Sequence, residues 1–210
     1  MDTKEYLLNL FNAKDYTGRM PIDIQYGRDL WPGIFKDLGF RKGVEIGVER
    51  GLYSEQLCKG NPEGLLYCVD SWKAYSGYRD HVSQEKLDRF YEETMQRMLP
   101  YNCELIRGFS MDVVKEFANG ELDYVYIDGN HDFQNVTNDI AEWSKKVRKG
   151  GIVSGHDYER HKGPSLIHVV EVVNGYTAAY RINPWFVVSR HRPTDGVAGD
   201  ISRSWMWVKE

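Results

Sequence analysis

The stretch that decides the fold of this chain is KGVEIGVERG, residues 42–51. An apolar run ends in Glu45-x-Gly47, and Gly51 follows four residues later, which is the pattern of a strand that turns tightly into a helix. Glycine is used in such turns because a side chain would block the turn itself or the close approach of a ligand. The stretch therefore predicts a ligand-binding turn that contains Glu45, Gly47 and Gly51.

The acid in this turn indicates the kind of ligand. The dinucleotide fingerprint Gly-x-Gly-x-x-Gly has glycine where this chain has Glu45, so an NAD or nucleotide-sugar enzyme is disfavoured. A carboxylate at this position suits a cationic, amine-bearing ligand, and S-adenosylmethionine is such a ligand. Asp70 ends the next apolar run, 23 residues after Gly47, close to the roughly 20-residue spacing of a ribose-binding acid. Asp70 and the adjacent Ser71 complete this part of the predicted cofactor site.

The rest of the chain alternates short apolar runs with stretches of helical period. After the first strand, which ends at the Gly47 turn, three more strands are predicted at residues 65–70, 104–108 and 122–128. A fifth is predicted to begin at residue 150. Helices are predicted at residues 84–99, 135–147 and 164–173, and two further strands at 185–189 and 204–208. Strands that alternate with helices predict an α/β fold with a parallel sheet.

Two further motifs carry a family resemblance. They are YIDGNH at residues 126–131 and GGIVSGHDY at residues 150–158. With the glycine turn before them, the chain resembles the class I S-adenosylmethionine-dependent methyltransferases, in particular the small-molecule branch of sugar and macrolide O-methyltransferases. Phe133 departs from that pattern, which commonly has Tyr there. The resemblance implies a Rossmann-like, doubly wound sheet of seven strands, mostly parallel, with a C-terminal antiparallel hairpin.

Length and charge limit the alternatives. The 210 residues predict one methyltransferase domain, with an N-terminal helical cap at 1–42 and a catalytic core at 43–210. The cap either closes over a substrate or only covers a sheet edge. A net charge of −4 disfavours a nucleic-acid partner. Without an apolar run of about 18 residues, no membrane span is expected. We expect a cytoplasmic protein with a small-molecule acceptor; a homodimer is one option.

Two strand-end acids predict a metal site. Asp128 and Asp157 follow the fourth and fifth predicted strands, whose ends meet at one crevice in a doubly wound sheet. With His156 they form a donor set for Mg²⁺ or Mn²⁺. The resemblance implies the same metal role for Asp128 and Asp157, whereas His156 stands where an acid is often found. Alternatively, Asp157 caps a loop and Asp128 orients the cofactor or substrate.

His131 is the predicted catalytic base, acting beside Asp128. Imidazole titrates near neutral pH and can accept the proton of an acceptor hydroxyl. The alternative role for His131 is a helix cap or a packing contact. Ser110 follows the third predicted strand, and we expect it near the adenine of the cofactor.

The predicted function is O-methylation of a small hydroxylated metabolite or sugar, with S-adenosylmethionine as donor and possible assistance by a divalent metal. One alternative is a metal-free N- or O-methyltransferase that uses His131 alone. Another is a catalytically inactive cofactor-binding protein that serves as a partner subunit. The presence of Asp128, His131 and Asp157 argues against such a loss of catalysis, because binding alone needs none of them.

Overall fold

The computed structural model describes residues 2–75, 83–160, 167–188 and 202–210. Its described strands form one twisted sheet in the order β1-β7-β8-β6-β5-β2-β3-β4. The strands are β1 (Ile22–Ile24), β2 (Lys42–Ile46), β3 (Leu65–Asp70), β4 (Cys103–Arg107), β5 (Leu122–Ile127), β6 (Val147–Gly155), β7 (Trp185–Val188) and β8 (Ser204–Val208). Of these, β8 runs antiparallel to its neighbours β6 and β7, and the other described pairs are parallel. The predicted doubly wound α/β sheet with its C-terminal hairpin is confirmed.

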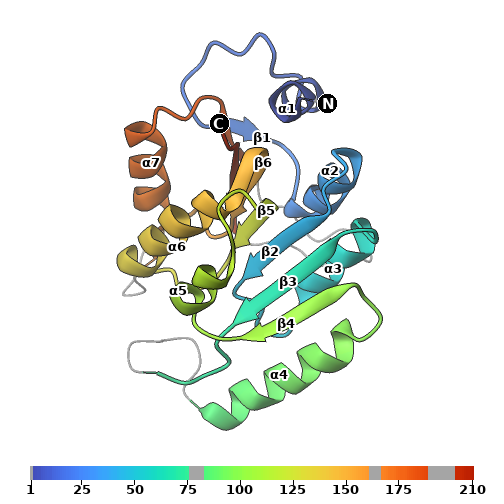
Figure 1. The fold of residues 1–210 in the computed structure, drawn as a ribbon. Coiled ribbons are helices and arrows are strands. Elements are labelled where there is room, and N and C mark those ends of the chain that lie inside the picture. Colours follow the sequence, from blue (N-terminus) through green and yellow to red (C-terminus); the bar gives the residue numbers. More distant parts are fainter. Residues whose placement is uncertain (1, 76–82, 161–166, 189–201) are drawn as a thin grey trace.

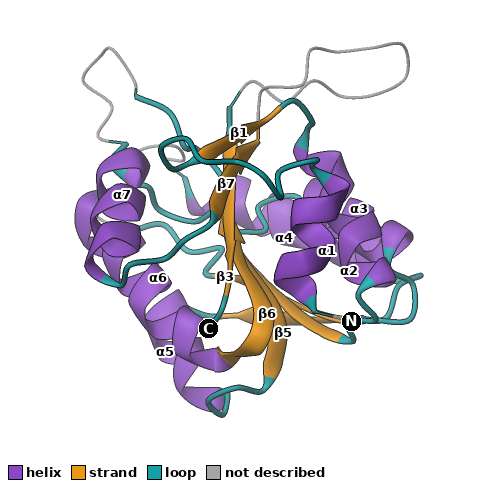
Figure 2. Ribbon diagram, turned by 90° about the horizontal axis from the view of Figure 1, so that it is seen from above, coloured by secondary structure: helices purple, strands orange, loops and turns teal. Residues whose placement is uncertain are grey.

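Helices cover both faces of this sheet (Figure 2). One face carries α1 (Thr3–Leu10), α2 (Trp31–Asp37), α3 (Leu52–Gly60) and α4 (Gln84–Met98), and the other carries α5 (Ser110–Val113), α6 (Phe133–Lys146) and α7 (Val169–Ala179). Each face has its own apolar core, built around Trp31 and Phe35 on the first and Trp143 and Trp205 on the second. Because both faces are buried, the central strands are continuous apolar runs rather than alternating ones.

The N-terminal segment differs from the helical cap that the sequence predicts. Residues 22–24 form the edge strand β1, which pairs with β7 through Ile22 and Phe186 and makes an eighth strand. The short 3-10 helix Arg28–Leu30 then leads to the carboxyl ends of the central strands. The segment therefore extends the sheet edge and also reaches the crevice through Arg28, and its closure over a substrate stays a prediction.

Most element boundaries lie close to their predictions, with two differences. β6 begins at Val147 rather than near residue 150, because Val147 already pairs with Leu122 before an irregularity in the register. α7 spans Val169–Ala179 rather than 164–173. Residues 164–166 of that prediction, and residue 189 of the strand predicted at 185–189, lie outside the described residues.

The strand order fixes the place of the crevice. From β2 the chain proceeds outward through β3 and β4, and then returns to β5 on the other side of β2 before continuing to β6. The carboxyl ends of β2 and β5 therefore flank the point where the winding reverses, which is where open α/β sheets bind their ligands.

Candidate active site

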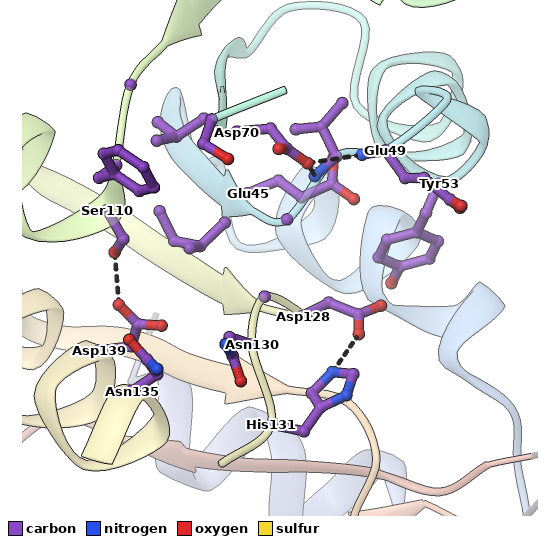
Figure 3. A pocket seen from close by; sticks show the side chains of 18 of the residues that line it. Glu45, Glu49, Tyr53, Asp70, Ser110, Asp128, Asn130, His131, Asn135 and Asp139 are labelled. Atoms are coloured by element: carbon purple, nitrogen blue, oxygen red, sulfur yellow. Dashed lines mark hydrogen bonds and ion pairs between the residues drawn. The ribbon is translucent and has the colours of Figure 1, made fainter. Parts of the chain in front are cut away.

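A cleft of about 500 Å³ opens at this reversal point (Figure 3). Its wall is made from the loops that follow β2, β3, β4 and β5, with side chains from α6 and the N-terminal segment. Of the predicted site residues, the cleft wall includes Glu45, Gly47, Asp70, Ser71, Ser110, Asp128 and His131. Gly51, His156 and Asp157 are not part of this wall.

Glycine is needed at the two positions of the turn, 47 and 51, for different physical reasons. Gly47 has φ +89°, and a Cβ there would lie 2.0 Å from the carbonyl oxygen of Asp128. Glycine is therefore required at 47 because the loop after β5 crosses directly over it. Gly51 has φ +70° at the start of α3, where a Cβ would lie 3.0 Å from Thr94. Its conformation serves the start of the helix, so the predicted contact of Gly51 with a ligand is not supported by its position.

Asp70 organises the turn as well as facing the cleft. One carboxylate oxygen accepts hydrogen bonds from the backbone N–H groups of Val48 and Glu49, at 3.0 and 2.9 Å. The other oxygen accepts from the backbone N–H of Trp72 at 3.0 Å. A carboxylate has about four acceptor positions, so Asp70 can still accept from a ligand hydroxyl.

Glu45 is buried beneath the same turn. Its side chain is 2% exposed and accepts a hydrogen bond from the hydroxyl of Ser54. Burial raises the pKa of Glu45 to about 8, because desolvation disfavours the charged form. The carboxyl that the sequence predicts as a partner for a cationic ligand is therefore largely protonated near pH 7 when no ligand is bound.

A second buried acid lies at the opposite side of the cleft (Figure 3). Asp139 of α6 is 4% exposed and accepts a hydrogen bond from Ser110, whose Oγ accepts from Trp143 Nε1 at 2.7 Å. Burial raises the pKa of Asp139 to about 7. Asp139 is not among the site residues predicted from the sequence. It did carry a signal, since this acid interrupts the buried stripe formed by Val136, Ile140 and Trp143.

The third acidic group of the site consists of Asp128 and Asp157, which lie beside His131. His131 Nε2 lies 3.0 Å from Asp157 Oδ2 and 3.5 Å from Asp128 Oδ1. Ligand atoms of Asp128, His131 and Asp157 all lie within 4.8 Å of one another, as a metal site requires. Burial acts to raise the pKa of Asp128, but His156 and His131 outweigh it and hold that pKa well below its usual range.

His156 lies against the same two carboxylates. Its Nδ1 lies 3.2 Å from Asp157 Oδ2 and 3.6 Å from Asp128 Oδ1, and the residue is 9% exposed. Burial acts to lower the pKa of His156, but the facing tyrosine and carboxylates raise it. The imidazole of His131 also groups with the two acids, so it is a further possible metal donor, and the assignment of His156 as a metal ligand stays a prediction.

The structure also decides against a helix-capping role for His131. The N-cap of α6 is Asp132, whose Oδ1 accepts from the backbone N–H of Asn135 at 2.9 Å. The carbonyl oxygen of His131 accepts from the backbone N–H of His168 at 2.9 Å, which ties the loop to the start of α7. The imidazole is thus held against the carboxylates by a fixed backbone.

Arg28 is a site residue that sequence reasoning missed. Its Nη1 lies 3.3 Å from Asp128 Oδ2 and 3.3 Å from the hydroxyl of Tyr126, and its guanidinium lies 4.5 Å from the ring centre of Tyr53. The hydroxyl of Tyr53 donates to the carbonyl oxygen of Arg28 at 3.0 Å. No motif marks Arg28, because its partner Asp128 is 100 residues away along the chain.

Comparison with known proteins decides the family. The sequence profile of the methyltransferase domain family matches residues 44–158, more than half of the chain. The chain belongs to the methyltransferase domain family. The matched region begins in the strand before the Gly47 turn and ends just after Asp157, so it contains both the turn and the charged group.

Two uncharacterized proteins are similar to part of the chain. An uncharacterized protein of Sinorhizobium fredii (strain NBRC 101917 / NGR234), y4gI, is 23% identical over 57% of this methyltransferase-domain chain, which spans 13% of that relative. An uncharacterized protein of Acanthamoeba polyphaga mimivirus is 29% identical over 40% of the chain, and the match covers 40% of that relative.

Solved structures share the fold. The O-methyltransferase of Bacillus cereus, in complex with SAH, superposes with a TM-score of 0.59 at 16% identity, covering 100% of this chain and 91% of that one. The O-methyltransferase TomG of Streptomyces achromogenes, in complex with SAM, superposes with a TM-score of 0.60 at 16% identity, covering 100% of this chain and 90% of that one.

In the described residues of the present structure, no helix is long and apolar enough to span a membrane.

Proposed function

We propose that the protein transfers a methyl group from S-adenosylmethionine to a hydroxyl oxygen of a small acceptor, such as a sugar or another hydroxylated metabolite, with a divalent cation at the reacting end of the cleft. The observation that carries this proposal is the group of Asp128, His131 and Asp157 beside a cleft shaped by the Gly47 turn and Asp70. The SAM- and SAH-bound O-methyltransferases with the same fold support the choice of cofactor.

The cofactor runs along the cleft from α6 toward the charged group. Asp70, at the end of β3, accepts from the ribose hydroxyls, and the adenine lies on the side of Ser110. The methionine part lies near Glu45 and the Gly47 turn, so the sulfonium methyl faces Asp128. This direction follows from the chemistry, because the methyl group must end beside the residues that activate the acceptor.

The donor set fits a hard or borderline divalent cation. Two carboxylates and one imidazole suit Mn²⁺ or Mg²⁺, and the low pKa of Asp128 keeps that ligand charged throughout the neutral range. When bound, such an ion supplies a Lewis acid that lowers the pKa of an acceptor hydroxyl. Arg28 holds Asp128 Oδ2 from the other side, which orients Oδ1 toward His131.

The transfer itself needs alignment and the removal of one proton. The acceptor oxygen forms a bond to the methyl carbon as the carbon–sulfur bond breaks, and that electron pair stays on sulfur to give S-adenosylhomocysteine. The hydroxyl proton leaves to a base near Asp128. In the metal-free alternative for an oxygen or nitrogen acceptor, His131 is that base, with Asp157 stabilising the imidazolium at 3.0 Å.

The test combines binding and turnover. Calorimetry with S-adenosylhomocysteine comes first, followed by S-adenosylmethionine with sugars, phenols and aliphatic alcohols in Mg²⁺ or Mn²⁺, with product formation measured. We expect binding, which at about 100 times the dissociation constant stabilises the fold by about 2.7 kcal/mol, and methylation of one acceptor class. No binding of S-adenosylhomocysteine would remove the proposal. Binding with no methylation in any class favours the inactive partner subunit.

A further inference from the structure

Asp139 is a buried carboxyl with one oxygen still available inside the cleft. Oδ1 accepts from Ser110, and no residue in the described parts of the chain donates to Oδ2. A Cβ built on Gly129 would lie 3.7 Å from Oδ2, so this oxygen faces the loop that forms the cleft floor. Asp139 lines the cleft, and Oδ2 is therefore an acceptor that a donor on a bound ligand can reach.

The surroundings of Asp139 hold it in one orientation. Trp143 Nε1 donates to Ser110 Oγ at 2.7 Å, and Ser110 in turn donates to Asp139. Trp143 is fully buried, so this chain of two hydrogen bonds starts from a fixed group. The hydroxyl proton of Ser110 is therefore committed to Oδ1 of Asp139, which leaves Oδ2 as the carboxylate oxygen that can meet a ligand.

The position along the cleft identifies the ligand group. Figure 3 shows Ser110, Asn135 and Asp139 together at one side, with Asp70 between them and Tyr53, while Asp128 and His131 lie apart from that side. The methyl group must reach Asp128, so the side of Asp139 takes the opposite end of the cofactor. That end is the adenine, whose 6-amino group is an N–H donor and whose ring fits beside the half-exposed Phe109.

We propose that Asp139 Oδ2 recognises adenine by accepting a hydrogen bond from its 6-amino group, with Ser110 and Trp143 as the positioning residues. This inference rests on the proposed function, because it assigns one contact of the proposed cofactor. It also revises the expectation for Ser110, which lies beside the adenine but orients the residue that reads it. Because burial raises the pKa of Asp139 to about 7, the carboxylate form is the main one at pH 8.

The experiment deletes the two partners of this hydrogen bond in turn. Calorimetry at pH 8 compares S-adenosylhomocysteine with its 6-deamino analogue on the wild-type protein, Asp139→Asn and the control Glu142→Gln, an exposed acid on the same helix. The wild type should bind the analogue about 10- to 100-fold more weakly, the range for leaving a buried polar group unpaired. Asp139→Asn should bind S-adenosylhomocysteine at least about tenfold more weakly and discriminate less than about threefold. Glu142→Gln should behave as the wild type.

Each contrary outcome has one meaning. If wild-type protein binds both compounds equally, the inference is wrong, and this holds even where Asp139→Asn does not fold. If Asp139→Asn folds and keeps the wild-type ratio, another group reads the amine and the inference is again wrong. If wild-type protein binds neither compound, the proposed function fails and the inference fails with it.

Discussion

The acids that face the cofactor part of the cleft and the acid at its reacting end differ in their tendency to ionise. Glu45 and Asp139 have raised pKa values because burial disfavours the charged form of each, and this outweighs the serine hydroxyl that donates to it and acts to lower the pKa. Asp128 has a lowered pKa because its interactions with His156 and His131 outweigh the effect of its burial. The neighbours, and not the residue type, therefore divide the cleft into a nearly neutral part for the cofactor and a charged part for acceptor activation.

The largest effect is expected at the charged end when the metal is removed. Chelation with EDTA should reduce turnover by about 10³-fold or more, because several kcal/mol of charge stabilisation is lost, and Mg²⁺ or Mn²⁺ should restore it. Asp157→Asn should weaken metal binding in the same assay. Asp157 has φ +53°, which asparagine tolerates, so this variant removes the charge without straining the backbone. Full activity after exhaustive chelation would contradict the metal assignment and leave His131 as the base.

His131→Ala tests the same end through its imidazole. We expect a loss of about 10²- to 10⁴-fold in rate with little change in S-adenosylhomocysteine affinity, because His131 acts on the acceptor side. The matched control is Asp132→Ala, which removes the cap of α6 and should cost about 1 kcal/mol of stability. Rate and melting temperature are measured on both. Unimpaired turnover in a folded His131→Ala protein would end its catalytic assignment.

Asp70 lies between the two ends, and its removal should affect binding rather than chemistry. Asp70→Ala should weaken S-adenosylhomocysteine affinity about 10- to 100-fold, the range for hydrogen bonds to a charged group. The three backbone N–H groups that Asp70 binds would also lose their partner, so part of the effect comes from a looser turn. Asp88→Ala, on the exposed face of α4, is the control. Unchanged affinity in Asp70→Ala would remove Asp70 from the ribose site.

The smallest expected effect is a change in how stability depends on pH. Glu45 titrates near 4.5 unfolded and about 8 folded, so the folded state binds the extra proton between these values. Its contribution to the free energy of unfolding is therefore highest below pH 4.5 and falls as pH rises to 8, by at most about 1.4 kcal/mol per pH unit. Glu45→Gln should flatten this dependence in urea unfolding at pH 5–8, and the exposed Glu63→Gln should not. The same slope in Glu45→Gln would contradict the raised pKa.

The sequence was sufficient for features that depend on local pattern. Short apolar runs, separated by stretches of helical period, predicted β3, β5 and their neighbours. The YIDGNH motif was enough to place Asp128 and His131 just after a strand. It could not separate the reasons for the glycines, since Gly47 is required by the backbone of Asp128 and Gly51 by the start of α3. It also did not predict that the imidazole of His131 groups with the two carboxylates as a possible metal donor, because neighbouring positions in a motif do not reveal which way each side chain points.

What the sequence by itself determined is the alternation of strands and helices, the turn at Gly47 and the acids at the strand ends, because each depends on residues adjacent in the chain. Tertiary structure alone decided that Arg28 meets Asp128, that Ser110 meets Asp139, and that residues 22–24 extend the sheet. It also decided which acids are charged. A pKa depends on burial and on charges brought close by folding, and neither is written in the local sequence.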